Sequence, residues 1–166
     1  MYTNWSADFA VVGVTVVALA LCVLVHYEGL QGISHRLHAI KAMQRGKVVL
    51  GVFGIIALHV IETWIFGIAI WVLLDGVAGA GSVSGAARLG LLDAVYLSAA
   101  TFSTVGFGDL APAGPIRFLS GTEALTGFIL ITWSASFLYL EMEEFWSVRA
   151  RRRPTHRHYD DGGTQE

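Results

Sequence analysis

The stretch TFSTVGFGD, residues 101–109, holds the residue types in this sequence that are best suited to binding an ion. Gly106 and Gly108 permit backbone angles that are closed to other residues, so successive carbonyl groups can all turn to one side. The resulting ladder would consist of the carbonyl oxygens of Thr104, Val105, Gly106 and Phe107, with the Thr104 hydroxyl below them. Oxygens with no charged side chain between them can replace the hydration waters of a cation. One chain offers too few oxygens for each ring, so several chains must surround one axis.

Ionisable residues inside apolar runs are the second feature that could do chemistry. His59 and Glu62 lie in the middle of one run, and Glu123 lies near the start of another. An unpaired charge in a bilayer interior costs about 3 kcal/mol or more, so such residues face protein or water and usually have a role.

Three hypotheses for these residues stay open. In the preferred one, Glu62 or Glu123 braces the irregular stretch, or the helix before it, from behind. In the next, Glu62 is neutral and hydrogen-bonds a Ser or Thr of a neighbouring helix. In the last, His59 and Glu62 lie three residues apart on one helix face and sense protons or bind a metal, with His26 as a third ligand. Metal binding ranks last because the ligands are few and their spacing is unspecific.

The elements that must position these residues follow from composition and hydropathy. Of the 166 residues, 54% are hydrophobic and only 14% are charged, whereas soluble domains carry about a quarter charged residues. Three apolar segments, residues 9–25, 48–74 and 116–140, can cross a bilayer core, which needs about 20 apolar residues. The composition therefore indicates an all-α membrane protein with three transmembrane helices and excludes a soluble globular enzyme.

Basic residues are concentrated in two places, the segment between the first two spans and the tail after the third. The positive-inside rule puts both in the cytoplasm, with the N-terminus outside and the protein in the plasma membrane. Residues 30–45 have an amphipathic pattern that suits a helix on the inner leaflet, with a solvated cationic loop as an equal alternative. Anionic lipid would contact four basic residues there, Arg36, Lys41, Arg45 and Lys47.

The segment between the second and third spans contains the ion-binding stretch. Residues 76–90 are rich in Gly, Ala and Ser and predict a flexible outer loop. Residues 91–102 then predict a short apolar helix with Asp93 as its N-cap, too short to span the bilayer. Irregular backbone at membrane depth is tolerated only when it is buried in protein or lines a water-filled cavity. The segment is therefore predicted to be a re-entrant helix and loop.

The hexapeptide TVGFGD, residues 104–109, placed after a short helix and between two spans, resembles the pore loop of potassium channels, and the resemblance extends over residues 48–146. It implies a homotetrameric channel selective for K+ over Na+, with K+ as the permeant ion and no other cofactor. The filter residues would be Thr104, Val105, Gly106, Phe107 and Gly108, supported by Asp109 and Thr101.

The resemblance also assigns roles in the third span. Gly127 corresponds to the glycine often treated as a gating hinge, and close helix packing is an equal alternative. Ile131 and Ala135, one and two turns further along, are candidate cavity-lining residues.

Three positions depart from the family pattern. Phe107 replaces the commoner Tyr, Tyr96-Leu97 stands where many members have paired tryptophans, and Ala100 stands where some keep a buried acid. Each change removes a polar strut, so the filter is predicted to be held mainly by packing and to inactivate readily.

The predicted organisation has four parts. Residues 1–28 form the N-terminus and first span, 29–47 the basic segment, 48–146 the pore domain, and 147–166 a disordered tail. The predicted function is K+ conduction. The alternatives are a weakly selective cation channel and a non-conducting sensor built on His59 and Glu62. No nucleophile–base pair is recognisable, so neither an enzyme nor a nucleic-acid partner is expected.

Overall fold

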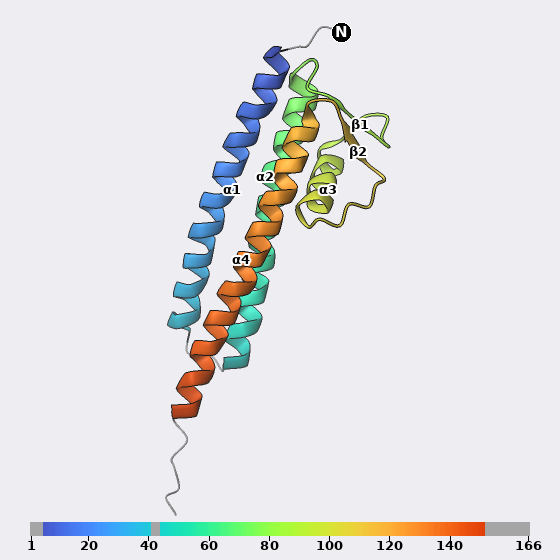
Figure 1. Cartoon of the computed structure of the whole chain (residues 1–166). Coiled ribbons are helices and arrows are strands. Elements are labelled where there is room, and N and C mark those ends of the chain that lie inside the picture. The colour runs from blue at the N-terminus through green and yellow to red at the C-terminus, as the bar shows by residue number, and fades with distance from the viewer. Residues whose placement is uncertain (1–4, 41–43, 152–166) are drawn as a thin grey trace, which may run out of the picture.

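The computed structural model describes residues 5–40 and 44–151, which form long helices side by side and a small side structure near one end (Figure 1). In chain order the elements are α1 (Trp5–Ala39), α2 (Gln44–Gly76), β1 (Ser82–Ser84), α3 (Leu91–Phe102), β2 (Ala111–Ala113) and α4 (Ile116–Arg151). α1, α2 and α4 are each long and apolar enough to cross a membrane. The prediction of an all-α membrane protein with three spans is confirmed.

The first helix does not end near residue 28. α1 continues without interruption to Ala39, so the segment predicted as a separate surface helix or loop is the last part of the first helix. Leu30 is buried in a cluster with Ile55 and Leu58 of α2, and Leu37 is also buried. The amphipathic pattern of this segment therefore reflects packing of α1 on α2, because a stripe of apolar residues suits a neighbouring helix as well as a membrane surface.

The loop after α2 is more ordered than its composition predicts. β1 pairs antiparallel with β2, and Val83 lies opposite Pro112. Ala80 is buried, and its carbonyl accepts the N–H of Ile116 at 2.8 Å. The prediction of a flexible outer loop is therefore wrong for this part. Small residues permit flexibility, but they equally permit the two strands β1 and β2 to approach each other closely.

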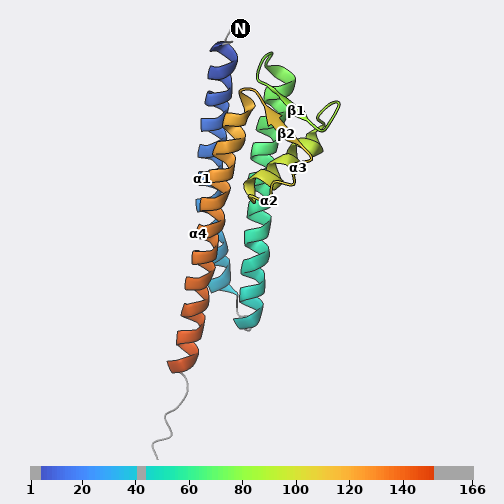
Figure 2. The same ribbon diagram turned by 45° about the vertical axis from the view of Figure 1, so that its right-hand side comes forward.

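α3 has the bounds that the sequence predicts, and it lies against one side of the bundle beside α2 and α4 (Figure 2). Its N-cap is Gly90 rather than Asp93. Asp93 lies one turn into the helix, where its carboxylate accepts the N–H of Gly90 at 3.0 Å. The carboxylate thus satisfies one of the N–H groups that a helix start leaves open.

The main apolar core lies where α3 meets the long helices. It joins Phe66, Ile70 and Leu73 of α2 to Leu97 and Phe102 of α3, together with residues of α1 and α4. Gly67 allows α2 to approach α3 closely, since a Cβ there would lie 2.7 Å from the Val95 main chain. This core sets the position of α3 and of the loop that follows it.

Candidate functional site

The loop after α3 has an unusual backbone. The φ angles of Thr104, Gly106 and Gly108 are 60°, 53° and 80°, so every second residue is in the left-handed region. The glycines were predicted to take such angles, but Thr104 was not. A β-branched residue with positive φ is a rare and strained arrangement. The start of the loop is fixed by the N–H of Gly106, which donates to the Ala100 carbonyl at 3.0 Å.

The side of this loop that faces away from the bundle is uncovered in a single chain. Val105 and Phe107 are 56% and 69% exposed, and a Cβ added at Gly106 or Gly108 would meet no atom within 4 Å. In contrast, Phe102 just before the loop is 2% exposed. Irregular backbone does not face lipid, so this surface must border protein or water.

Tyr96 provides a polar support for the loop that the sequence interpretation missed. Its hydroxyl donates to the Asp109 carboxylate at 2.9 Å, and its ring stacks on Phe107 with 6.2 Å between ring centroids. The hydrogen bond to Asp109 raises the pKa of the Tyr96 phenol. The prediction of a loop without polar struts is therefore wrong at Tyr96. A cavity of about 190 Å³ lies behind the loop, lined by Ala100 and Thr101 among others.

Glu123 contacts α3 at a point where three helices meet. Its side chain and that of Ser98 are fully buried, and the Ser98 hydroxyl is hydrogen-bonded both to Glu123 and to the Thr63 carbonyl of α2, the latter at 2.8 Å. This is the contact that the bracing hypothesis requires of Glu123. The bracing role itself stays a prediction.

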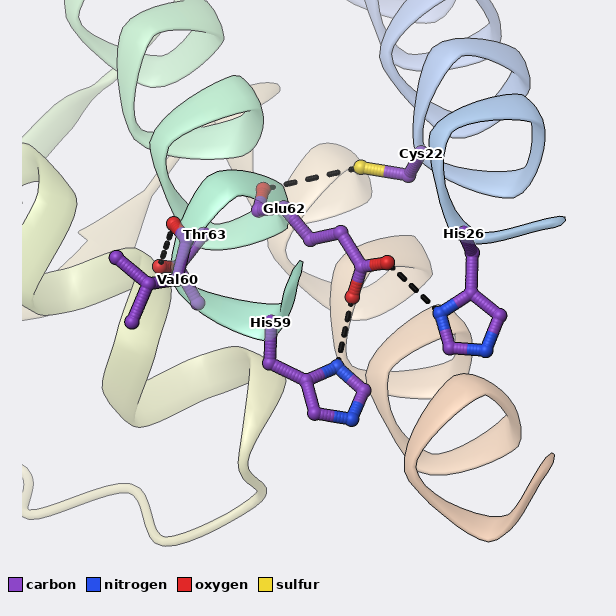
Figure 3. Close-up of polar contacts among 6 residues, drawn as sticks. All are labelled: Cys22, His26, His59, Val60, Glu62 and Thr63. Atoms are coloured by element: carbon purple, nitrogen blue, oxygen red, sulfur yellow. Dashed lines mark hydrogen bonds and ion pairs between the residues drawn. The ribbon is translucent and has the colours of Figure 1, made fainter. Parts of the chain in front are cut away.

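The partners of Glu62 are the two histidines that the third hypothesis grouped with it. One carboxylate oxygen lies 2.8 Å from Nδ1 of His26 and the other lies 2.7 Å from Nδ1 of His59 (Figure 3). The hypothesis of a hydrogen bond to a Ser or Thr of a neighbouring helix is therefore wrong. Glu62 is linked to α3 through His59, whose ring lies 5.8 Å from that of Phe102.

The histidine partners connect α1 to the rest of the molecule. His26 is fully buried, and its ring lies 5.1 Å from the ring of Trp133 in α4. One turn earlier in α1, the Cys22 thiol donates to the Glu62 carbonyl at 3.7 Å, as Figure 3 also shows. The cluster of His26, His59 and Glu62 thus lies at the junction of α1, α2 and α4, near the end of α3.

Gly127 lies against the end of α3. A Cβ at this position would collide with the carbonyl of Phe102, and α4 runs through Gly127 as one continuous helix. Both observations support close packing over a hinge. Ile131 borders a groove that also includes His59 and Ser103, and Ala135 is exposed on α4.

The basic residues expected at the lipid surface are only partly described. Arg36 is exposed near the end of α1, and Lys47 lies in the first turn of α2. Lys41 and the side chain of Arg45 lie outside the described residues, as does most of the predicted tail. The lipid contact stays a prediction.

Comparison with known families identifies the class of protein that this fold and loop define. The family described as "Ion channel" matches residues 58–144, just over half of the chain, from the middle of α2 to α4. The chain therefore belongs to this family, whose pore is built from two transmembrane helices. α1 lies outside the matched residues.

Two curated relatives share a shorter segment with this chain. Protein LctB of Bacillus caldotenax is 48% identical over 44 residues, which are 26% of this chain and 33% of that protein. Protein LctB of Geobacillus stearothermophilus is 46% identical over the same length and share. The aligned segment thus spans about a third of these relatives. No solved structure matches the chain.

Proposed function

We propose that this ion channel is a K+-selective channel in which four identical chains each contribute one TVGFG segment to a common filter. The observation that carries the proposal is the alternation of φ at Thr104, Gly106 and Gly108. Left-handed angles at every second residue turn successive peptide groups the same way, so that N–H groups lie on one side of the backbone and carbonyls on the other. A row of carbonyl dipoles is the arrangement that replaces the hydration shell of K+.

The uncovered surface of the loop supports an assembly around an axis. Val105 and Phe107 are exposed in one chain, and irregular backbone would have to face lipid if the chain stood alone. Copies of the same chain placed around one axis cover this surface and supply the remaining oxygens of each ring. Four copies agree with the K+-channel pore loops that the TVGFGD sequence resembles.

The position of α3 adds an electrostatic contribution. Its last residue, Phe102, lies beside His59 in the middle of α2, so the C-terminal end of α3 lies about halfway along the bundle. The partial negative charge of a helix C-terminus stabilises a cation nearby. With the N-terminus outside the plasma membrane, as the basic residues favour, this end faces the bilayer centre, where a permeating cation is least well hydrated.

The test is ion flux through the purified protein in liposomes. We expect K+ to pass far more readily than Na+, and barium to block the flux. Gly106→Ala should abolish K+ flux, because φ is 53° at Gly106 and alanine rarely adopts this angle. Gly121→Ala is the control and should leave the flux unchanged, because Gly121 lies in regular helix. Both sites have open space for a Cβ, so the two variants differ in backbone angle and not in steric clash. Equal K+ and Na+ fluxes would establish the weakly selective alternative. No flux from a folded assembly would favour a non-conducting sensor.

A further inference from the structure

The cluster of His26, His59 and Glu62 has the composition of a metal site. The three side chains come from two helices, and one ligand atom of each lies within 4.8 Å of the others. Two imidazoles and one carboxylate are a frequent ligand set for Zn²⁺, leaving a fourth position open. Among the described residues this is the one group of three such side chains close enough to share an ion.

The distances within the cluster are close to those of a bound ion. Nδ1 of each histidine lies 2.7–2.8 Å from a Glu62 oxygen. Two ligands at about 2.0–2.1 Å from one tetrahedral ion are separated by about 3.3 Å. Each of these two pairs would have to widen by about 0.5 Å, and the ligand atoms of the two histidines, which lie within 4.8 Å of each other, would have to reach the same separation. Side-chain rotation alone can supply such a movement.

The electrostatics of the site favour a cation. Glu62 is fully buried, and a buried carboxylate is costly unless a positive charge compensates it. Two neutral histidines supply hydrogen bonds but no charge. The C-terminal end of α3 adds further partial negative charge at Phe102, beside His59. Either a metal ion or a proton on one histidine could compensate this negative charge, so an experiment must distinguish the two.

The surroundings of His26 favour a metal over a proton on that histidine. His59 is 19% exposed and borders a groove of about 350 Å³ that also includes Thr63 and Ser103, so the cluster is open on that side. On the other side, Nε2 of His26 is buried and has no hydrogen-bond partner in the described part of the chain. A protonated His26 would leave a charged N–H unpaired there, whereas a metal at Nδ1 leaves at most a neutral one.

The geometry points to a binding site for one divalent transition-metal ion of the Zn²⁺ class in each chain, held by His26, His59 and Glu62. The inference goes beyond K+ conduction and does not depend on it. The ion would join α1, which lies outside the residues matched by the ion channel family, to α2 next to the end of α3. Metal binding would thereby fix the position of the first helix on the pore domain.

The experiment uses the full chain, purified in detergent without a histidine tag and stripped with a chelator. Co²⁺ is added as a spectroscopic probe, and Zn²⁺ is measured by equilibrium dialysis and elemental analysis. We expect one ion per chain and the intense visible absorption of four-coordinate Co²⁺, displaced by Zn²⁺. The variants His26→Gln, His59→Gln and Glu62→Gln should each weaken binding by about tenfold or more.

Two exposed residues of α1 provide matched controls. His35→Gln and Glu28→Gln remove the same chemical groups from the same helix and should leave binding unchanged. If a Gln variant fails to fold, His59→Cys keeps a ligand in place and should add a thiolate-to-Co²⁺ charge-transfer band.

Three results would overturn the inference. The first is a folded wild-type protein that gives no visible Co²⁺ spectrum. The second is Zn²⁺ binding that is unchanged in all three cluster variants. The third is a wild-type protein that binds no metal, combined with cluster variants that change the pH dependence of thermal stability. That result would identify a protonated histidine in place of the ion. A negative K+ flux result would leave all of these measurements unaffected.

Discussion

Two buried glutamates, Glu62 in α2 and Glu123 in α4, have the same side chain and the same complete burial but opposite surroundings. Both oxygens of Glu62 face ring nitrogens, on His26 and His59. Glu123 meets the Ser98 hydroxyl with one oxygen, and the other has no hydrogen-bond partner in the described residues. The partners, and not the burial, decide which charge state each carboxyl group can keep.

The two carboxyl groups also differ in the number of protons that their hydrogen-bond partners supply. Ser98 has one hydroxyl proton but contacts two oxygens, the Thr63 carbonyl and the Glu123 carboxyl group. The single hydroxyl proton can fully satisfy only one of these acceptors, so both contacts are satisfied when Glu123 is a neutral carboxylic acid whose O–H donates to Ser98. Glu62 instead accepts two N–H bonds, which suits an ionised carboxylate. One glutamate thus forms part of a charged cluster on α1 and α2, and the other forms part of a neutral chain across α2, α3 and α4.

The largest effect should come from truncating the charged cluster. Glu62→Ala leaves the buried His26 and the partly buried His59 without an acceptor for their ring N–H groups, each of which costs about 1–3 kcal/mol of unfolding free energy, and it also opens a cavity. Thermal unfolding of the detergent-solubilised protein measures this loss, and Glu28→Ala, at an exposed position of α1, is the control. A loss similar to that of the control would mean that Glu62 carries no buried charge.

Truncating the neutral chain should have a smaller effect. Glu123→Ala leaves the Ser98 hydroxyl oxygen without its donor and opens a small cavity, which together cost about 1–3 kcal/mol. The same unfolding assay applies. If Glu123→Ala proved as costly as Glu62→Ala, the contrast between the two sites would be wrong.

Amide substitutions test the charge state of each carboxyl group. Glu123→Gln keeps a donor for Ser98, so it should cost less than about 1 kcal/mol. Glu62→Gln places an amide NH₂ against an imidazole N–H and should be clearly more destabilising than Glu123→Gln. Measurement of both variants at the same pH gives the order directly, and the reverse order would exchange the assigned charge states.

The smallest effect is expected at the exposed hydrogen bond of the loop. Tyr96→Phe removes the bond to Asp109 while keeping the stacking on Phe107, so stability should fall by less than in any of the glutamate variants. Current inactivation should nevertheless become faster, and Tyr139→Phe, an exposed position of α4, is the control. Unchanged inactivation would show that the bond does not support the filter.

The same bond has a predictable response to pH. Because the pKa of Tyr96 is raised in the folded state, the bond contributes below the ordinary phenol pKa of about 10 and is lost as pH rises through the higher folded value. Inactivation should therefore not vary with pH near neutrality and should accelerate only at strongly alkaline pH, a pH dependence that Tyr96→Phe should remove.

The helices that a short stretch of sequence specifies by itself were predicted correctly. The three spans follow from long apolar runs, and the bounds of α3 follow from a short run of helix formers that ends in a glycine-rich loop. The length of α1 did not follow, because an apolar stripe looks the same whether it faces a membrane surface or another helix.

The contacts between site residues on different helices could not be predicted from local sequence patterns. His26 and Glu62 are separated by 36 residues, and no periodicity within one helix specifies which face of another it meets. His26 was named as a possible ligand, but its contact with Glu62 depends on how α1 packs. The Tyr96–Asp109 bond and the positive φ of Thr104 depend in the same way on how the chain folds back after α3.

The pairing of β1 with β2 connects the chain before α3 to the chain after it. It fastens Ser84 to Ala111, and Gly85 packs directly against the Asp109 carbonyl at the far end of the TVGFG segment. The segments before and after α3 are thus joined into a closed ring of chain. A molecule that bound residues 82–85 would therefore act on the end of the TVGFG segment through these contacts, without entering the proposed filter.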